Sequence, residues 1–246
     1  MNIPIRYTTA RSFLTNRYLI IAGHLTVLLF LLSGCALTPR VPLVYQPGAV
    51  VETLSANASL SISKGGQGMS SNGYLLYQRP GRMRMVVLSP FGTTMLEAVV
   101  SGETITIINS PERTAFSGRL EDLPDQGEGQ TWRDARWVMD VEPPGTSLKN
   151  GTLTRSNRLG EREQVVYEEG LIVSKQLDNG DMAHYGDYVV VNGVPLATEI
   201  VMESHDGGRF RIRISEPEVN AELSPDAFKP NLDGLTVLPL AALRKK

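Results

Sequence analysis

The stretch "YLLYQRPGRMRMVVLSPFGTTMLEAVVSGETITIIN", Tyr74 to Asn109, decides the fold that the sequence predicts. Apolar residues recur at every second position in most of it, which is typical of β-strands with one buried face. Pro, Gly and Ser interrupt this alternation at intervals, and the interruptions are too short for helical crossovers. We therefore expect a meander of antiparallel strands.

One turn within this stretch carries an unusual residue. Phe91 stands between Pro90 and Gly92, at the tip of a bend that joins two apolar strands. Turn tips face water, so a phenylalanine at this position is either folded back onto the sheet or kept outside for a purpose. The alternation of the neighbouring strands leaves both possibilities open.

The same alternation continues on both sides of this stretch, over residues 50–218, with Asn-Gly hairpin signals at 179–180 and 192–193. One segment departs from it. "TWRDARWVMDVEPPG", Thr131 to Gly145, predicts a helix that ends before its two prolines. We expect an α+β protein, in which an incomplete, half-open antiparallel β-barrel carries a short helical lid.

The predicted helix is too short to cover so long a sheet, and large exposed apolar faces are rare. A curved sheet that encloses an apolar cavity beneath the helix resolves this difficulty. Methionine side chains adapt to variable apolar guests, although each could equally be a simple core residue. The candidates to line this cavity are Met83, Met85, Met95, Trp132, Trp137 and Met139.

The first 34 residues are typical of a secretory signal. They contain three arginines, no acidic residue and an apolar run, Tyr18 to Leu32, which is short for a membrane span. The run closes on "LSGC", which resembles the bacterial lipobox and implies that Cys35 is lipidated. The alternative is an ordinary signal peptide with an incidental cysteine. Ala36 follows in place of an aspartate, which by the same resemblance implies an outer-membrane location facing the periplasm.

Charge and composition disfavour several functional classes. Without the signal, the chain holds 21 basic and 26 acidic side chains, a net charge of about −5, which gives no basic surface for nucleic acid. The two remaining histidines, His184 and His205, are too few for a set of nucleophile, base and orienting group. No spacing matches a calcium loop. We therefore expect neither an enzyme nor a bound metal or cofactor.

Three segments together resemble the LolA/LolB family, which carries lipoproteins through the periplasm and receives them at the outer membrane. They are the stretch Tyr74–Asn109, "RWVM" at Arg136–Met139 and "VNGVPLATEIVM" at Val191–Met202. The resemblance is closest to the LolB branch, whose members are themselves lipoproteins. It implies a cavity for the acyl chains of lipoproteins or other lipids, and a periplasmic LolA-like carrier as a possible partner.

The same resemblance implies a role for the turn at Pro90, Phe91 and Gly92. In the LolB branch the corresponding loop protrudes and carries an exposed leucine implicated in membrane insertion, so the resemblance implies a membrane-insertion loop. The alternative is a lipid-anchored structural subunit of an envelope assembly, with the same fold but a filled core. The predicted organisation is a lipoprotein signal peptide (1–34), a lipidated cysteine and linker (35–48), a LolB-like lipid-binding domain (49–230) and a C-terminal tail (231–246).

Overall fold

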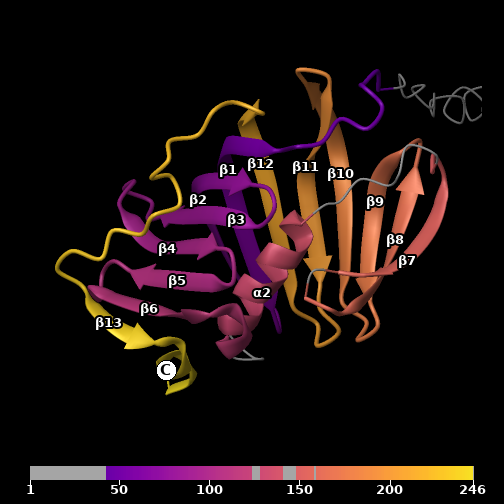
Figure 1. Ribbon diagram of the computed structural model, residues 1–246. Helices are drawn as coiled ribbons and strands as arrows, with labels where there is room; N and C mark the ends of the chain where they lie inside the picture. Colours follow the sequence, from indigo (N-terminus) through magenta and orange to yellow (C-terminus); the bar gives the residue numbers. More distant parts are fainter. Residues whose placement is uncertain (1–42, 124–127, 141–147, 158, 246) are drawn as a thin grey trace, which may run out of the picture. The chain divides into compact units, whose positions relative to one another are not determined.

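The computed structural model describes residues 43–123, 128–140, 148–157 and 159–245. The predicted signal peptide, Cys35 and most of the linker lie outside these residues. Within the described part, thirteen strands form one sheet in the order β13-β6-β5-β4-β3-β2-β1-β12-β11-β10-β9-β8-β7 (Figure 1). No helix of the described residues is long and apolar enough to cross a membrane.

Most strands end at turn residues, as the sequence indicated, whereas α2 begins at Glu128, before the expected start at Thr131, and β13 was not expected. The strands of the first half are β1 (Thr53–Lys64), β2 (Gln67–Gln78), β3 (Arg82–Leu88), β4 (Thr94–Ser101), β5 (Thr104–Asn109) and β6 (Thr114–Arg119). Those of the second half are β7 (Gly151–Ser156), β8 (Arg162–Glu168), β9 (Leu171–Leu177), β10 (Met182–Val191), β11 (Val194–Glu203) and β12 (Arg209–Val219), followed by β13 (Thr236–Pro239). The helical elements are η1 (Leu120–Asp122), α2 (Glu128–Met139) and η2 (Leu240–Lys245).

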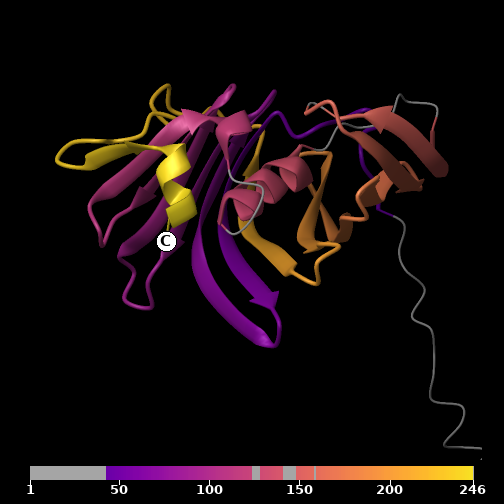
Figure 2. The same ribbon diagram turned by 90° about the horizontal axis from the view of Figure 1, so that it is seen from below.

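The architecture is mostly β, one large open sheet with one short α-helix, rather than the expected α+β class. Two antiparallel meanders, β1–β6 and β7–β12, join because β1 pairs with β12. The sheet ends at two separate edges, β13 and β7, so it is open. It is also curved, and α2 lies on its concave side (Figure 2). The meander itself and the lid position of the helix are as predicted.

The register of β2, β3 and β4 assigns the two faces of the sheet. Met83 lies opposite Val100 and Met85 opposite Ala98, and all four side chains are buried on the concave side. Residues opposite each other in an antiparallel pair share a face, whereas neighbours along a strand alternate. The concave side of the first half is therefore lined by apolar and small residues, as the sequence predicted.

The C-terminal segment differs from the expected tail. Strand β13 pairs in parallel with β6, and Leu240 of η2 is fully buried. The Cδ1 atom of Leu240 lies 3.1 Å from the position that a Cβ atom would occupy on Gly118, so the missing side chain of Gly118 makes room for it. The sequence did not predict this contact, because the apolar run that forms β13 and η2 is short and shows no periodicity.

The chain between β12 and β13 covers part of the convex side of the sheet. Phe228 is buried, with the Arg82 guanidinium 5.9 Å from its ring centre. Arg84 Nη1 donates a hydrogen bond to the Ala227 carbonyl at 3.0 Å. Phe228 thus docks on the sheet.

Candidate functional site

The turn between β3 and β4 holds Phe91 away from the body of the protein. The Phe91 side chain is 94% exposed, which excludes the alternative in which it folds back onto the sheet. The Gly92 amide donates to the Ser89 carbonyl at 2.9 Å, and the Ser89 amide donates to the Thr93 carbonyl at 2.8 Å. Gly92 has a φ of 80°, which glycine adopts without strain. The tip is a closed, hydrogen-bonded turn.

The Ser89 hydroxyl stabilises this turn further. Its Oγ atom accepts from the amides of Phe91 and Thr93, both at 3.2 Å. At the base of the turn, the Ser71 hydroxyl of β2 donates to the Leu88 carbonyl. These contacts leave the backbone of the tip few unsatisfied donors, so exposing Phe91 requires no disorder of the loop.

Gly73 lets β2 approach β3 closely below the turn. A Cβ atom at this position would lie 1.7 Å from the Val86 carbonyl oxygen, a distance that no side chain allows. Gly73 lies opposite Val87, next to a register irregularity between Val87 and Leu88. The direction of the Phe91 turn therefore depends on the absence of a side chain at residue 73.

The structure brings five of the six predicted cavity residues together. The five belong to one buried core between α2 and the sheet: Met83, Met85, Trp132, Trp137 and Met139. Met95 is not among them. It is 45% exposed and is left unpaired at a register irregularity, where Val87 pairs with Leu96 and Leu88 pairs with Thr94.

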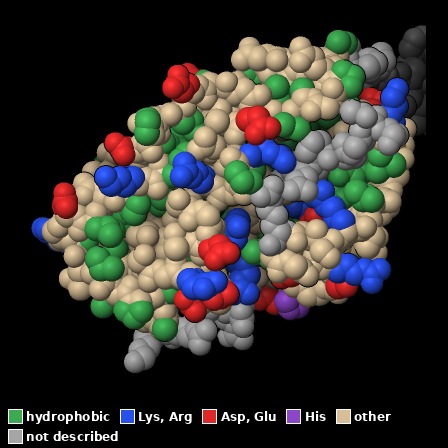
Figure 3. All heavy atoms as spheres, in the orientation of Figure 1, with side chains coloured by type: hydrophobic (Ala, Val, Ile, Leu, Met, Phe, Trp, Pro, Cys, Tyr) green, Lys and Arg blue, Asp and Glu red, His purple; other side chains and the backbone are tan. Residues whose placement is uncertain are grey.

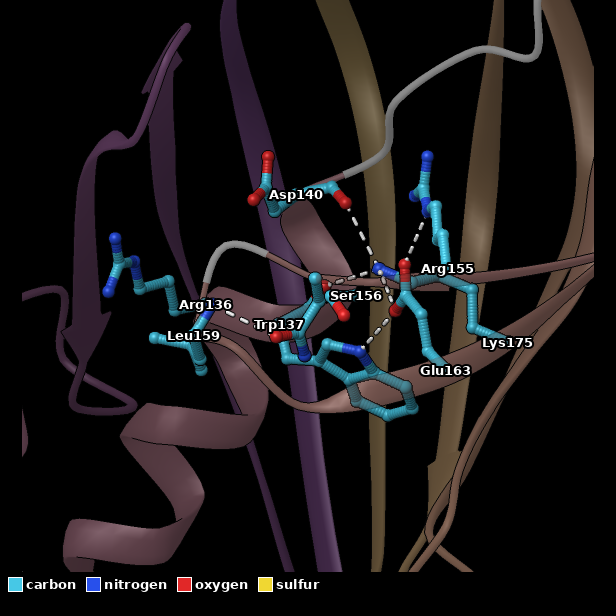
Figure 4. A pocket seen from close by; sticks show the side chains of 9 residues that line it. Arg136, Trp137, Asp140, Arg155, Ser156, Leu159, Glu163 and Lys175 are labelled. Carbon is cyan, nitrogen blue, oxygen red and sulfur yellow. Dashed lines mark hydrogen bonds and ion pairs between the residues drawn. The ribbon is translucent and has the colours of Figure 1, made fainter.

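The second half of the sheet holds α2 through a buried charged cluster, which we call the Glu163–Lys175 cluster (Figure 4). Glu163 of β8 and Lys175 of β9 are both buried, with 3.5 Å between Lys175 Nζ and Glu163 Oε2. Arg155 Nε donates to Glu163 Oε1 at 2.7 Å, and the Trp137 indole N–H donates to Oε2 at 2.8 Å. Both carboxylate oxygens are thus hydrogen-bonded.

The same cluster caps the C-terminal end of α2. The last carbonyls of a helix have no partner within the helix. Lys175 Nζ donates to the carbonyls of Trp137 at 2.9 Å and Asp140 at 3.0 Å. The Tyr185 hydroxyl of β10 donates to the Val138 carbonyl at 2.8 Å. A cation and a hydroxyl from the sheet therefore fix this end of the helix, where the helix dipole favours positive charge.

The electrostatics of the cluster keep it charged at neutral pH. Burial alone would raise the pKa of Glu163, but Lys175, the Trp137 N–H and Arg155 together lower it below its ordinary value. Burial lowers the pKa of Lys175 to about 8, against the opposing effect of Glu163. Both groups are therefore ionised near pH 7, and each depends on the other.

This cluster was not predicted from the sequence, although a signal was present. Glu163 stands in phase with Val165 and Tyr167, which are buried residues of β8. Lys175 stands in phase with Leu177 on β9. A charged residue at an apolar position of an alternating strand indicates a buried partner, and two such residues on neighbouring strands predict an ion pair.

A second polar group lies around the turns β9–β10 and β11–β12. Asp181 is buried, and its Oδ1 atom accepts from the His205 amide at 2.9 Å and lies 2.8 Å from the His205 ring. Burial raises the pKa of Asp134 on α2 to about 7; the Gln130 hydrogen bond opposes this rise and Asp181 adds to it. The hydrogen bond to Asp181 raises the pKa of His205.

Charged side chains line the pockets beside α2, and Figure 3 shows Lys, Arg, Asp and Glu side chains close together on this face of the protein. A groove of about 660 Å³ includes Arg119, Arg133, Glu103 and Glu161 among its lining residues. A smaller pocket of about 110 Å³ adjoins the Glu163–Lys175 cluster. In the described part of the chain, no group of His, Cys, Asp and Glu side chains could hold a metal ion.

Comparison with solved structures identifies similar folds. The "putative outer membrane lipoprotein-sorting protein domain" of Vibrio parahaemolyticus has a TM-score of 0.53 and 9% identity, covering 72% of this chain and 89% of that chain. A DUF1329 family protein from Desulfovibrio piger has a TM-score of 0.50 and 12% identity, covering 73% and 90%. A LolA superfamily protein from Nitrosomonas europaea reaches only 0.47 at 11% identity, covering 76% and 93%, and supports no conclusion.

These similarities establish the fold alone. The chain shares the open-sheet fold of a lipoprotein-sorting domain, as the resemblance of its sequence implied. No protein-family profile matches the sequence, and comparison with curated proteins finds no relative.

Proposed function

We propose that this chain is an outer-membrane-anchored lipoprotein that binds acyl chains between α2 and the sheet and helps to insert them into the membrane. Lipidated Cys35 would hold it at the periplasmic face, and a soluble LolA-like carrier would deliver the cargo. The fold shared with a lipoprotein-sorting domain and the apolar side chains that α2 covers support this function.

The exposed Phe91 is the observation that carries the proposal. A large aromatic side chain that a hydrogen-bonded turn holds in water lowers its free energy when it enters an apolar environment. Transfer of a phenylalanine side chain into lipid contributes about 1.5–3 kcal/mol. That is small beside a lipid anchor, so Phe91 acts locally, where it presses the protein onto the bilayer and disturbs the packing of lipids.

Cargo binding requires the core to rearrange. Met83, Met85 and Trp132 are buried in contact with the rest of the core, so an acyl chain takes their place only if α2 moves away from the sheet. This exchange replaces one apolar contact by another and needs no nucleotide. Methionine and tryptophan side chains suit it, because they adapt to or cover a variable apolar surface.

A lipid-anchored structural subunit is the second candidate function, and the buried state of these side chains favours it. The two candidates differ in whether a fatty-acyl probe enters the core. A spin-labelled or fluorescent fatty acid that binds the full chain, and that fails to bind Met85→Arg, supports lipid transfer. A protein that remains folded and binds no such probe supports the structural role.

Reconstitution tests the insertion step. The full chain is reconstituted in lipid vesicles, and a fluorescent diacyl lipoprotein is added. The rate at which this lipoprotein is incorporated into the bilayer is then measured. Phe91→Glu abolishes incorporation, whereas Phe91→Leu, which keeps an apolar tip, retains it. Equal rates for the two variants would refute a membrane-inserting role for this turn.

A further inference from the structure

A second exposed apolar pair lies at the end of the β1–β2 hairpin. Ile62 and Met69 are directly opposite each other in the two strands, and their side chains are 37% and 65% exposed. Figure 2 shows this hairpin (indigo) projecting beyond the neighbouring strands. Apolar side chains exposed on a projecting hairpin are available to an apolar partner outside the protein's own core.

This pair continues the apolar surface of the core. Ile62 lies opposite Phe210 of β12, and two residues earlier Leu60 lies opposite Ile212. Leu60, Phe210 and Ile212 are all buried. Since these residues share the concave face, one strand leads from the buried core to an exposed tip with no polar side chain between them on that face.

The hairpin tip and the Phe91 turn point to the same end of the sheet. Gly73 of β2 lies opposite Val87 of β3. Met69 is four residues before Gly73, and Phe91 is four residues after Val87. Since adjacent antiparallel strands run in opposite directions, Met69 and the Phe91 turn both lie beyond this paired position in the same direction. Met95, 45% exposed, follows the Phe91 turn.

The residues around both tips carry little net charge. The tip of the hairpin reads "KGGQGMSSNG" from Lys64 to Gly73, and the other turn reads "SPFGTT" from Ser89 to Thr94. Lys64 is paired with Asp206. Two separate apolar projections with hydroxyl and amide neighbours fit a deformable lipid surface, which bonds to polar groups at its interface and accepts apolar ones below it. A rigid protein partner would need one continuous face.

We propose that the β1–β2 hairpin is a second membrane-contacting element, and that Ile62 and Met69 enter the bilayer together with Phe91. This inference rests on the proposed function. Two contacts on adjacent hairpins fix the orientation of the domain on the membrane. They also place the apolar strip from Leu60 to Ile62 between the core and the bilayer, as the route by which acyl chains leave.

Photo-crosslinking in a Gram-negative host tests the contact in the full, processed chain. Benzoylphenylalanine replaces Met69, Ile62, Phe91 or Val189, one at a time, in cells whose phospholipids are labelled with radioactive phosphate. Val189 is a matched control, because it is 38% exposed on β10 near the opposite end of the sheet. Positions 62, 69 and 91 should crosslink to labelled phospholipid, and position 189 should not.

The outcomes separate the two proposals. The second contact would be overturned if position 91 crosslinks to lipid while positions 62 and 69 give no crosslink or crosslink only to protein. That result would leave the role of Phe91 standing. Absence of lipid crosslinks at all three positions would overturn both. In the incorporation assay, Met69→Glu should slow lipid insertion about tenfold or more, whereas Val189→Glu should leave the rate unchanged. Equal rates for Met69→Glu and the parent chain would count against the inference.

Discussion

The two halves of the sheet differ in the polarity of the side chains that they bury and expose. The half from β7 to β12 buries an acid and a base, Glu163 and Lys175, and uses them to hold the C-terminal end of α2. The half from β1 to β6 buries apolar and small side chains and exposes Phe91 and Met69 at its tips. The helix is therefore fixed by polar contacts on one side, while the other side presents the surface that we propose for lipid.

Lys175→Met should have the largest effect, because it disrupts the polar half. The substitution leaves Glu163 with less compensation and removes the donor to two helix carbonyls, so the free energy of unfolding should fall by about 3–5 kcal/mol. Urea unfolding of the full chain measures it.

The double variant Glu163→Gln/Lys175→Met is the matched control for that prediction. It removes both charges, so its free energy of unfolding should fall by less than the sum of the decreases measured for Glu163→Gln and Lys175→Met separately. A loss below about 1 kcal/mol for Lys175→Met alone would show that the cluster does not hold the helix.

Gly73→Ala should have the next largest effect and acts on the apolar half. The new Cβ atom would meet the Val86 carbonyl, so β2 and β3 must separate, at a cost of roughly 1–3 kcal/mol or more. Gly186→Ala is the control, because Gly186 also lies in a strand and no atom lies within 4 Å of the position that its new methyl group would occupy. That variant should be neutral or stabilised by about 0.4–1 kcal/mol. Equal losses would mean that the close approach at Gly73 is unimportant.

Asp134 lies on α2, the helix that both halves share. The variant Asp134→Asn tests how the free energy of unfolding depends on pH. The pKa of Asp134 is about 7 in the folded protein against 3.8 ordinarily, so the folded state keeps a proton that the unfolded chain releases. Its favourable contribution is therefore present below about pH 4 and is lost as the pH rises to 7. The variant should gain stability relative to the parent between pH 5 and pH 8. Urea unfolding at both pH values measures the gain, and parallel pH profiles would contradict the prediction.

Phe91→Glu should have the smallest effect on stability, within about 0.5 kcal/mol, because the side chain makes no contact with the core. Phe116→Ala is the contrasting variant in the same half: Phe116 is buried, and its truncation should cost about 3–5 kcal/mol. Thermal or urea unfolding distinguishes them. A loss of several kcal/mol for Phe91→Glu would place that residue in the folded core.

Local patterns predicted the parts of the fold that local physics determines. Alternation identified the strands and the shared face of Met83 and Met85, and Asn-Gly pairs marked their hairpins. The expected burial of Trp132 and Met139 on α2 also agrees with the structure. These features depend on residues close together in sequence.

Long-range contacts were not predictable in the same way. The pairing of β1 with β12, the docking of Leu240 against Gly118 and the burial of Glu163 beside Lys175 join distant segments. Nothing in a short window indicates which segments meet. For the candidate site, the turn residues around Phe91 predicted its position at a tip. The orientation of Met95 depends on the register between β3 and β4, which the sequence alone does not give.

The pairing of β1 with β12 has a consequence for how the chain acquires its structure. Strand β1 becomes a central strand only when Asn57 meets Ser215, near the other end of the polypeptide. Until then one of its edges offers free amides and carbonyls to any neighbouring strand. The sheet is completed only after the residues of β12 have been synthesised, so an unpaired edge of β1 is open to pairing with other chains during that time.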